Sequence, residues 1–245
     1  MHQGLWLGLL DVDDYRHSGS IYYREAGTFA EREHNLSGLK PWERRIHEDH
    51  FQSAGSILVP AAGGGREMLA LLDEGHGVDG FDCTPELVEV GLELLRERGA
   101  EARLLLTEPD EVPDELAGPY DGLWVGWGGY MHIAGRERRV QFLRQLRDRV
   151  EEGAPIVLSF WMSPHSSRRL RLIRGLANLV LALRLERRRV EPGDCLPGSF
   201  DHHFEQAEVE AEMREGGFEP FGVDEMPYGR AVGHAAALEP PLGAD

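Results

Sequence analysis

The chain has 245 residues, 41% of them hydrophobic, and carries a formal net charge of −17. Length and composition predict one folded domain with additions rather than two domains. The acidic balance disfavours nucleic acid as substrate or partner, because like charges repel the phosphate backbone. Cys83 and Cys195 lie far apart without metal-ligand spacing, which argues against a disulfide framework and a zinc site. No metal site is therefore predicted.

The first 55 residues are predicted to form one or two helices, a cap in front of the main domain. In KPWERRIHEDHF, Pro41 stands where a first-turn proline is favoured. Tyr22, Tyr23 and Trp42 in this cap are candidates for contact with a substrate. The opening residues show neither a basic leader nor a small-residue cleavage site, so a cytoplasmic protein is expected.

Residues 56–164 alternate short apolar runs with longer amphipathic stretches. The apolar runs read SILVP, GVDGFD, EARLLL, YDGLWVGW and APIVLSF. This alternation predicts βαβ units and hence an α/β fold with a doubly wound, mostly parallel sheet.

The first run ends in the small residues AAGGG, which include Gly63 and Gly65. A strand that turns sharply into a helix through small residues lets a ligand lie against the backbone N–H groups. Asp82 ends the second run, where a carboxylate in such sheets accepts both hydroxyls of a ribose. Together they predict a nucleoside-binding edge. The alternative is a tight turn and an aspartate that caps the helix starting at Thr84.

The stretches ILVPAAGGG and GFDCTPELV resemble class I S-adenosylmethionine-dependent methyltransferases, in which they commonly read VLDLGCGTG and GVDISPEML. The resemblance spans about residues 56–238. It implies S-adenosylmethionine as cofactor, held by a set of residues around the two stretches. That set comprises Ala61, Gly63, Gly65, Asp82 and Cys83.

The chain departs from the family pattern at two positions. Ala61 stands where the family has its first glycine, and Val59 stands where an acidic residue is frequent. The second candidate ligand is a dinucleotide such as NAD, because NAD folds share the turn and the ribose acid. NAD fits less well, since the spacing here is not G-x-G-x-x-G.

Two further stretches extend the resemblance to the rest of the site. LLLTEPDEVP is similar to the family turn GDAxDLP, which implies that Glu108 lies near the adenine, with Asp110 as the competing choice. YMHI is similar to the family stretch LHHI and implies a catalytic role for His132, with Tyr130 beside it. A neutral imidazole can take a proton from a substrate hydroxyl or amine.

Trp127 and Tyr130 follow the fourth predicted strand, at the sheet edge where such folds bind ligands. They are candidates to wall the pocket or to face a cationic sulfonium. Ordinary packing of aromatic side chains is the alternative, as is a His132 bonded to the backbone.

Residues 165–200 are predicted to be an insertion with one long helix over residues 168–189. Arginines stand at both ends of an apolar middle that is too short to cross a bilayer. A lid over the site is favoured, with docking on an anionic membrane surface or a homodimer contact as alternatives.

Residues 201–245 are predicted to complete the core. DHHF leads into the next helix, and His202 or His203 is a candidate to reach the substrate, because adjacent residues of an extended segment point to opposite sides. A helix then ends at Gly216–Gly217, and two strands joined at 227–229 form an antiparallel hairpin.

These features predict a soluble, metal-independent methyltransferase that acts on an O, N or S atom of a small molecule. The cofactor carries the activated methyl group, so the protein mainly has to align the acceptor and exclude water. The alternative is a protein of the same fold that binds the cofactor without methylating, as a scaffold or regulatory subunit.

Overall fold

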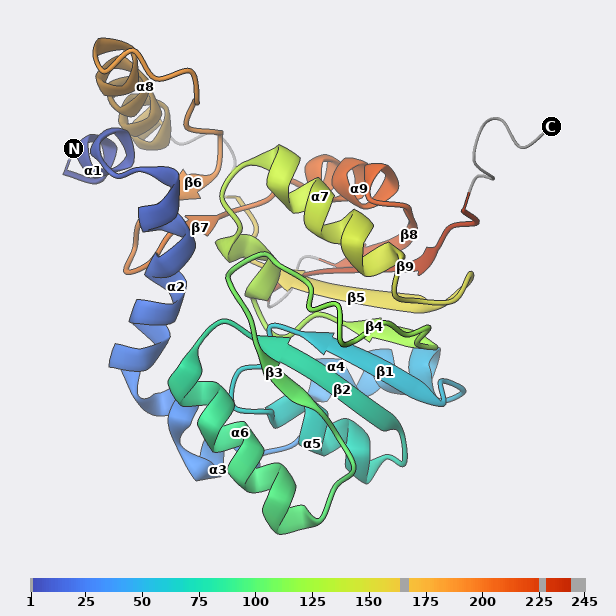
Figure 1. Cartoon of the computed structure of the whole chain (residues 1–245). Helices are drawn as coiled ribbons and strands as arrows, with labels where there is room; N and C mark the ends of the chain where they lie inside the picture. Colours follow the sequence, from blue (N-terminus) through green and yellow to red (C-terminus); the bar gives the residue numbers. More distant parts are fainter. Residues whose placement is uncertain (1, 164–167, 225–227, 239–245) are drawn as a thin grey trace.

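A seven-stranded sheet forms the centre of the computed structural model, which describes residues 2–163, 168–224 and 228–238 (Figure 1). The strand order is β3-β2-β1-β4-β5-β9-β8. Strands β1 to β5 are parallel, and β9 runs antiparallel to both of its neighbours, β5 and β8. The strands are β1 Ser56–Pro60, β2 Gly77–Asp82, β3 Leu104–Leu106, β4 Gly122–Trp124, β5 Pro155–Phe160, β8 Phe218–Asp224 and β9 Gly229–Ala235.

The predicted fold class is therefore confirmed, including the antiparallel C-terminal strands. Of the turn expected at 227–229, residue 227 lies outside the described residues, as does the tail after Leu238, and Gly229 already begins β9. DHHF contributes a short strand, β7 Asp201–His202, which pairs with β6 Asp194–Cys195 in a separate two-stranded sheet.

Helices cover both faces of the main sheet (Figure 1). Helices α4, α5 and α6 lie on one face, and α7 and α9 lie on the other. β1 is buried along almost its whole length and alternates between the two cores: Ile57 and Val59 join one cluster, and Leu58 joins the other. These helices are α4 Pro41–Ile46, α5 Arg66–Asp73, α6 Pro85–Arg98, α7 Arg136–Arg147 and α9 Gln206–Glu215.

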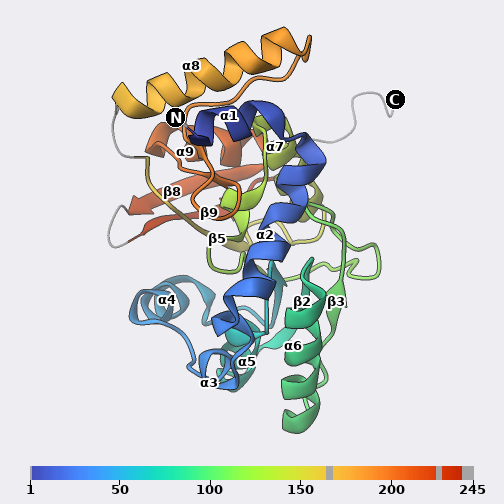
Figure 2. The ribbon, with the colours of Figure 1, turned by 90° about the vertical axis from the view of Figure 1, so that its left-hand side faces the viewer.

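The N-terminal cap is divided more finely than the one or two helices expected. It contains α1 His2–Leu9, α2 Val12–Ala26, α3 Arg32–Asn35 and α4. Gly27 and Gly38 adopt positive φ angles of 71° and 76°, which a helix cannot continue through. Figure 2 shows α2 crossing in front of the edge where the parallel strands end.

Helix α8, Arg168–Leu183, packs against α1 far from its position in the sequence (Figure 2). Gly4 and Gly8 of α1 form the contact. A Cβ at Gly4 would lie 2.6 Å from the carbonyl oxygen of Ile173, and one at Gly8 would lie 2.6 Å from Cβ of Val180. The two glycines, one turn apart, therefore let the helices approach closely.

Helix α8 ends at Leu183, not at residue 189 as expected. The following arginines bind the end of α1 instead: Arg184 donates to the carbonyl oxygens of Gly8 and Leu9, and Arg188 donates to that of Leu10. These carbonyl groups have no partner within their own helix, and a cation stabilises the negative end of its dipole.

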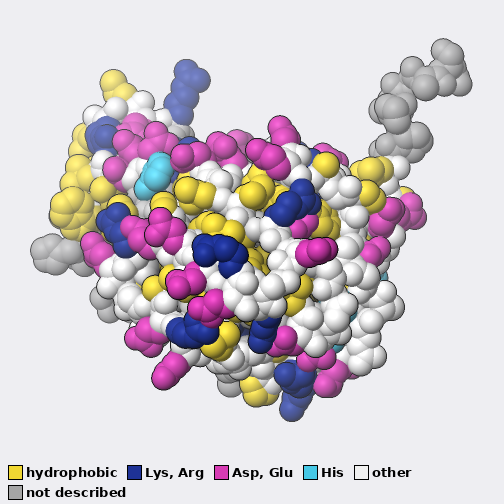
Figure 3. Space-filling view, turned by 60° about the horizontal axis from the view of Figure 1, so that its bottom comes forward, with side chains coloured by type: hydrophobic (Ala, Val, Ile, Leu, Met, Phe, Trp, Pro, Cys, Tyr) yellow, Lys and Arg dark blue, Asp and Glu magenta, His cyan; other side chains and the backbone are white. Residues whose placement is uncertain are grey.

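The outward face of α8 is apolar. Leu179 and Leu183 are 57% and 77% exposed, and Figure 3 shows apolar side chains gathered at the end of the molecule that carries α1 and α8. The described residues of α8 line neither of the two cavities that lie at the ends of the parallel strands, described below. Among the helices in the described ranges, none has the length and apolarity needed to cross a membrane.

Candidate active site

A first cavity of about 140 Å³ lies where the parallel strands end. It is closed on one side by α2, because Arg16 donates to the carbonyl oxygen of Pro109 at 2.9 Å and to Asp110 at 3.2 Å in the loop after β3. Most of the predicted cofactor residues line this cavity. They are Ala61, Gly63, Asp82, Cys83, Glu108 and Trp127.

The glycine turn has a specific conformation at each position. Gly63 and Gly65 have φ angles of 55° and 88°, which favour glycine. Gly64 packs against the side chain of Asn35, whose Oδ1 would lie 2.5 Å from an added Cβ. Gly65 is the N-cap residue immediately before α5 and does not line the cavity, so its role is to turn the chain.

Ala61, which replaces the first glycine of the family pattern, also has a positive φ, of 53°. A side chain in this region strains the backbone. The opposite loop accommodates it with glycines: a Cβ at Gly126 would lie 2.0 Å from the carbonyl oxygen of Ala61, and one at Gly129 would lie 2.3 Å from its Cβ. The departure at Ala61 therefore fits its surroundings.

The contact between Ala61 and Gly129 predicts that a second substitution can restore the stability that a first one removes. Gly129→Ala should destabilise the fold by about 1 to 3 kcal/mol, because the two methyl groups overlap. Ala61→Gly should restore most of the loss in the double variant, since the next atom is 3.8 Å from the added Cβ. Urea unfolding of the wild type, both single variants and the double variant measures the coupling, and additive effects would contradict this packing.

Asp82 links the turn to the next helix and also faces the cavity. Its Oδ2 accepts a hydrogen bond from Gly63 N at 2.8 Å, and its Oδ1 accepts one from Thr84 N at 2.8 Å. Burial raises the pKa of this carboxyl, while the backbone hydrogen bonds act in the opposite direction. Asp82 therefore does not cap α6, whose N-cap residue is Thr84; it fixes the backbone on both sides of the turn and lines the cavity as well.

Cys83 and Glu108 also line the first cavity. Burial, followed by the charge of Asp82, raises the pKa of the Cys83 thiol to about 12, so the thiol stays protonated at neutral pH. Asp110 is engaged by Arg16 and Arg138, whereas the side chain of Glu108 is 66% exposed and contacts only His17, at 3.5 Å, among described ion-pair partners.

A second cavity of about 220 Å³ adjoins the first. Tyr23, Phe29, Trp127 and His132 line both cavities, so a molecule in the second cavity would face one in the first. Tyr22, one of the predicted substrate contacts, lines the second cavity. Trp42 is buried and lines neither one.

Tyr23, His132 and Asp201 form a row of polar contacts at the junction of the cavities. Nδ1 of His132 donates to the carbonyl oxygen of Phe200 at 2.9 Å and lies 3.1 Å from Oδ1 of Asp201. A carbonyl oxygen only accepts, so in the neutral ring Nε2 carries the lone pair. Nε2 then accepts from the Tyr23 hydroxyl at 2.9 Å.

Besides Gly65 and Trp42, three more predicted site residues are not brought to the cavities. Tyr130 is fully buried, and its hydroxyl donates to Glu212 at 2.7 Å. His202 is also fully buried, while His203 is half-buried on the other side of β7. Neither histidine lines a cavity. The residue of DHHF that reaches the second cavity is Asp201, which the sequence pattern did not single out.

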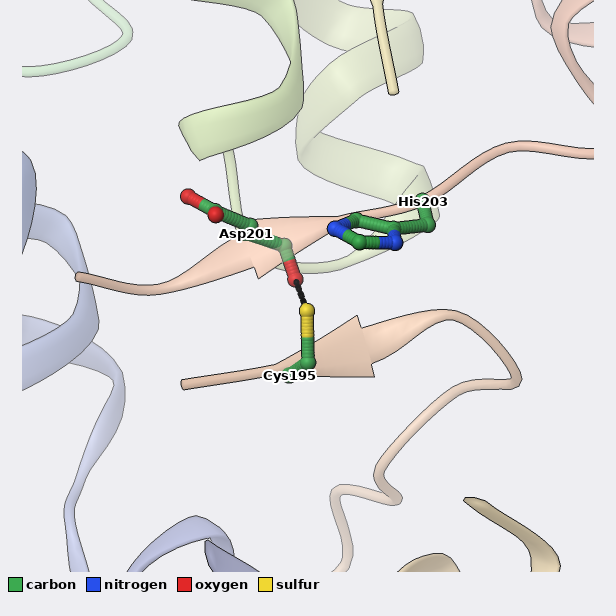
Figure 4. Close-up of side chains that lie close together, drawn as sticks. All are labelled: Cys195, Asp201 and His203. Atoms are coloured by element: carbon green, nitrogen blue, oxygen red, sulfur yellow. Dashed lines mark hydrogen bonds between the residues drawn. The ribbon is translucent and has the colours of Figure 1, made fainter. Parts of the chain in front are cut away.

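Within the described residues, two groups of side chains of metal-ligand type lie on or next to the strands β6 and β7. One is Glu191, Asp194 and His202, and the other is Cys195, Asp201 and His203, each with ligand atoms within 4.8 Å of one another. Figure 4 shows the second group, in which the Cys195 thiol donates to the main-chain carbonyl of Asp201 at 3.4 Å. The pairing of β6 with β7 brings these residues together. Their spacing in the sequence does not indicate a metal site.

His202 is held between two carboxylates: Nδ1 lies 2.7 Å from Asp194, and Nε2 lies 3.0 Å from Glu208. Although burial opposes it, these contacts raise the pKa of His202 to about 9. The protonated ring therefore contributes stability that is fully present below the ordinary value of about 6.5 and is lost as the pH rises through about 9.

The free energy of unfolding should accordingly fall by about 3 kcal/mol between pH 6 and pH 9 through His202 alone. His202→Gln removes this titration, so its stability should depend less steeply on pH over the same interval. Urea unfolding of both proteins at the two pH values measures the difference. Parallel pH profiles would show that His202 is not protonated in the folded chain.

Comparison with known proteins supports the fold. No protein-family model matches the chain, and no curated protein matches it significantly. Solved structures do match, among them the 1,6-didemethyltoxoflavin-N1-methyltransferase of Burkholderia thailandensis, with bound 1,6-didemethyltoxoflavin and S-adenosylhomocysteine. The TM-score is 0.66 at 16% identity, over 94% of this chain and 92% of that one. The chain has the fold of S-adenosylmethionine-dependent methyltransferases.

Two further structures show the same fold. A S-adenosylmethionine-dependent methyltransferase of Methanosarcina mazei matches with a TM-score of 0.60 at 18% identity, over 81% of this chain and 99% of that one. The magnesium protoporphyrin IX methyltransferase of Synechocystis, with bound S-adenosylhomocysteine, gives 0.58 at 13% identity, over 92% and 98%. The expected resemblance to this group of enzymes is thus confirmed in the fold.

Proposed function

We propose that the chain is a methyltransferase that uses S-adenosylmethionine and methylates an O, N or S atom of a small molecule. The observation that carries the proposal is the junction of two cavities. The first contains Asp82 and the glycine turn, the second is lined by aromatic side chains, and the row of Tyr23, His132 and Asp201 lies between them.

The donor set of the first cavity fits S-adenosylmethionine. Asp82 offers a carboxylate for the ribose hydroxyls, Leu87 and Cys83 offer apolar surface for the adenine, and Glu108 offers an acceptor for its amino group. When bound, S-adenosylmethionine supplies an activated methyl group on a cationic sulfur. Two of the matched methyltransferase structures contain bound S-adenosylhomocysteine.

The chain's own residues then have two tasks. The aromatic walls hold the acceptor and exclude water. His132 accepts the acceptor's proton at Nε2, directly or through the Tyr23 hydroxyl, and Asp201 and the carbonyl of Phe200 hold the ring in the required tautomer. We propose a reaction without a metal ion, since Asp201 already binds His132 and Ser199, and His202 already binds Asp194 and Glu208.

Formation of S-adenosylhomocysteine tests the proposal. Incubation with S-adenosylmethionine and a panel of amines, phenols and thiols should yield S-adenosylhomocysteine with at least one acceptor, in amounts equal to the methylated product. Tight binding of a cofactor that stays intact with every acceptor would instead support the second function, a non-methylating scaffold. This second function is considered because Ala61 and Val59 depart from the family pattern.

A further inference from the structure

The second cavity is walled mainly by aromatic rings. Of the fourteen described residues that line it, seven are Phe, Tyr or Trp. Tyr228 meets Trp127 and Trp161 nearly at right angles, with centroid separations of 5.3 and 4.7 Å and interplanar angles of 68° and 71°. Rings at right angles form the corner of a box, and such boxes bind organic cations through the negative faces of the rings.

The charged side chain that lines the second cavity is negative. Asp201 is the only acidic residue that lines it, and no lysine or arginine does so among the described residues. The two contacts of its carboxylate, from His132 and Ser199, both end on Oδ1. Oδ2 accepts no hydrogen bond from the described residues, and it is therefore available to a donor in the cavity.

The cation that contacts the outer side of Trp127 lies in a group of balanced charges. Nζ of Lys40 lies 3.1 Å from the centroid of the Trp127 ring, although Lys40 lines neither cavity. Arg66 forms ion pairs with Glu43 and Glu67 in the same region. These two cations and two anions sum to zero, so Asp201 sets the charge that a ligand meets.

From these observations we infer that the acceptor is a compact amine that enters the second cavity as an ammonium ion. This inference rests on the proposed function and names its substrate class. The aromatic walls and Oδ2 of Asp201 bind the cation, and a net charge of −17 on the chain attracts it. Anionic acceptors are disfavoured by the same charges.

The proton transfer balances with the residues at the junction. One N–H bond of the ammonium group breaks, and its electron pair stays on nitrogen as the lone pair needed for methylation. The proton passes to Nε2 of His132, either directly or in exchange with the Tyr23 hydroxyl, which lies 2.9 Å away. The imidazolium so formed is stabilised by Asp201, 3.1 Å from Nδ1.

Calorimetric titration with three probes of similar shape tests the inference. The probes are phenethylamine, 2-phenylethanol and 3-phenylpropionate, which carry a positive, a neutral and a negative group. They are titrated with and without saturating S-adenosylhomocysteine. Phenethylamine should bind about tenfold or more tightly than the alcohol, the scale of one cation–π contact with a charged hydrogen bond, and the carboxylate should bind least.

Two substitutions locate the effect. Asp201→Asn should reduce the affinity for phenethylamine to that for 2-phenylethanol, and Trp161→Leu should weaken the amine more than the alcohol. Glu152→Gln removes the same charge on an exposed residue before β5, at the opposite end of that strand, and should leave all three affinities unchanged. Retained affinity for S-adenosylhomocysteine confirms that each variant is folded.

The outcomes separate the inference from the function on which it rests. Failure of phenethylamine to bind more tightly than both other probes overturns the inference, whatever happens with the cofactor. Absence of S-adenosylhomocysteine binding counts against the proposed function instead. If Glu152→Gln and Asp201→Asn lose equal affinity for phenethylamine, then the net charge of the chain explains the preference for the amine. That result would also overturn the inference.

Discussion

His132→Gln should slow methyl transfer by about 10²- to 10⁴-fold, the usual contribution of a general base, while the affinity for S-adenosylhomocysteine stays unchanged. Glutamine can still hydrogen-bond the Tyr23 hydroxyl but cannot take up a proton. The measurement is single-turnover formation of S-adenosylhomocysteine with an acceptor from the panel, at saturating concentrations of both substrates, so that binding defects do not enter the rate.

Two other variants complete this test. Tyr23→Phe should lose part of the rate, since it removes the hydroxyl that contacts Nε2 of His132. His50→Gln changes a histidine that lines neither cavity and should keep the wild-type rate. A full rate in His132→Gln would show that the acceptor loses its proton elsewhere, or needs to lose none.

Asp82→Ala is expected to weaken cofactor binding by about 1.5 to 3 kcal/mol, the scale of a lost hydrogen bond to a charged group. The structure adds a second effect. The variant leaves Gly63 N and Thr84 N without their acceptor, so stability should fall by about 1 to 3 kcal/mol for each group that stays unsatisfied. Calorimetry with S-adenosylhomocysteine and urea unfolding measure the two effects separately.

Asp79→Ala is the matched control. Asp79 stands on the same strand, β2, and accepts hydrogen bonds from Arg103 and Tyr120, but it lines neither cavity. Its replacement should cost stability without changing cofactor affinity. If Asp82→Ala likewise lowers stability but leaves cofactor affinity unchanged, then Asp82 organises the glycine turn and does not contact the cofactor.

The central strands were predictable because their signals are local. SILVP and GVDGFD are short apolar runs with turn residues at their ends, and they form β1 and β2 over those same residues. The glycine turn and Asp82 follow from the same local pattern, since the carboxyl ends of neighbouring parallel strands meet at one edge.

Tyr130 shows where local pattern is insufficient. The segment Gly129–His132 is a 3₁₀ turn, in which residues 130 and 132 point in different directions. His132 therefore faces the cavities, while Tyr130 points into the core toward Glu212. No periodic signal in four residues distinguishes a 3₁₀ turn from other turns, so both residues were expected at the site.

Asp201 and the end of α8 depend on contacts between distant segments. Asp201 gains its place from the pairing of β7 with β6 and from His132, which belongs to another part of the chain. Helix α8 ends at Leu183, just before Leu185 adopts a positive φ of 59°, and Arg184 and Arg188 bind carbonyl oxygens at the end of α1. Neither partner can be read from the sequence around these residues.

Calorimetric titration of the purified chain with S-adenosylmethionine, S-adenosylhomocysteine and NAD tests the central claim most directly. The account predicts that the first two compounds bind once per chain and that NAD binds far more weakly, because the turn and Asp82 are arranged for a single nucleoside beside a second, aromatic cavity. Preferential binding of NAD, or binding of none of the three, would contradict it.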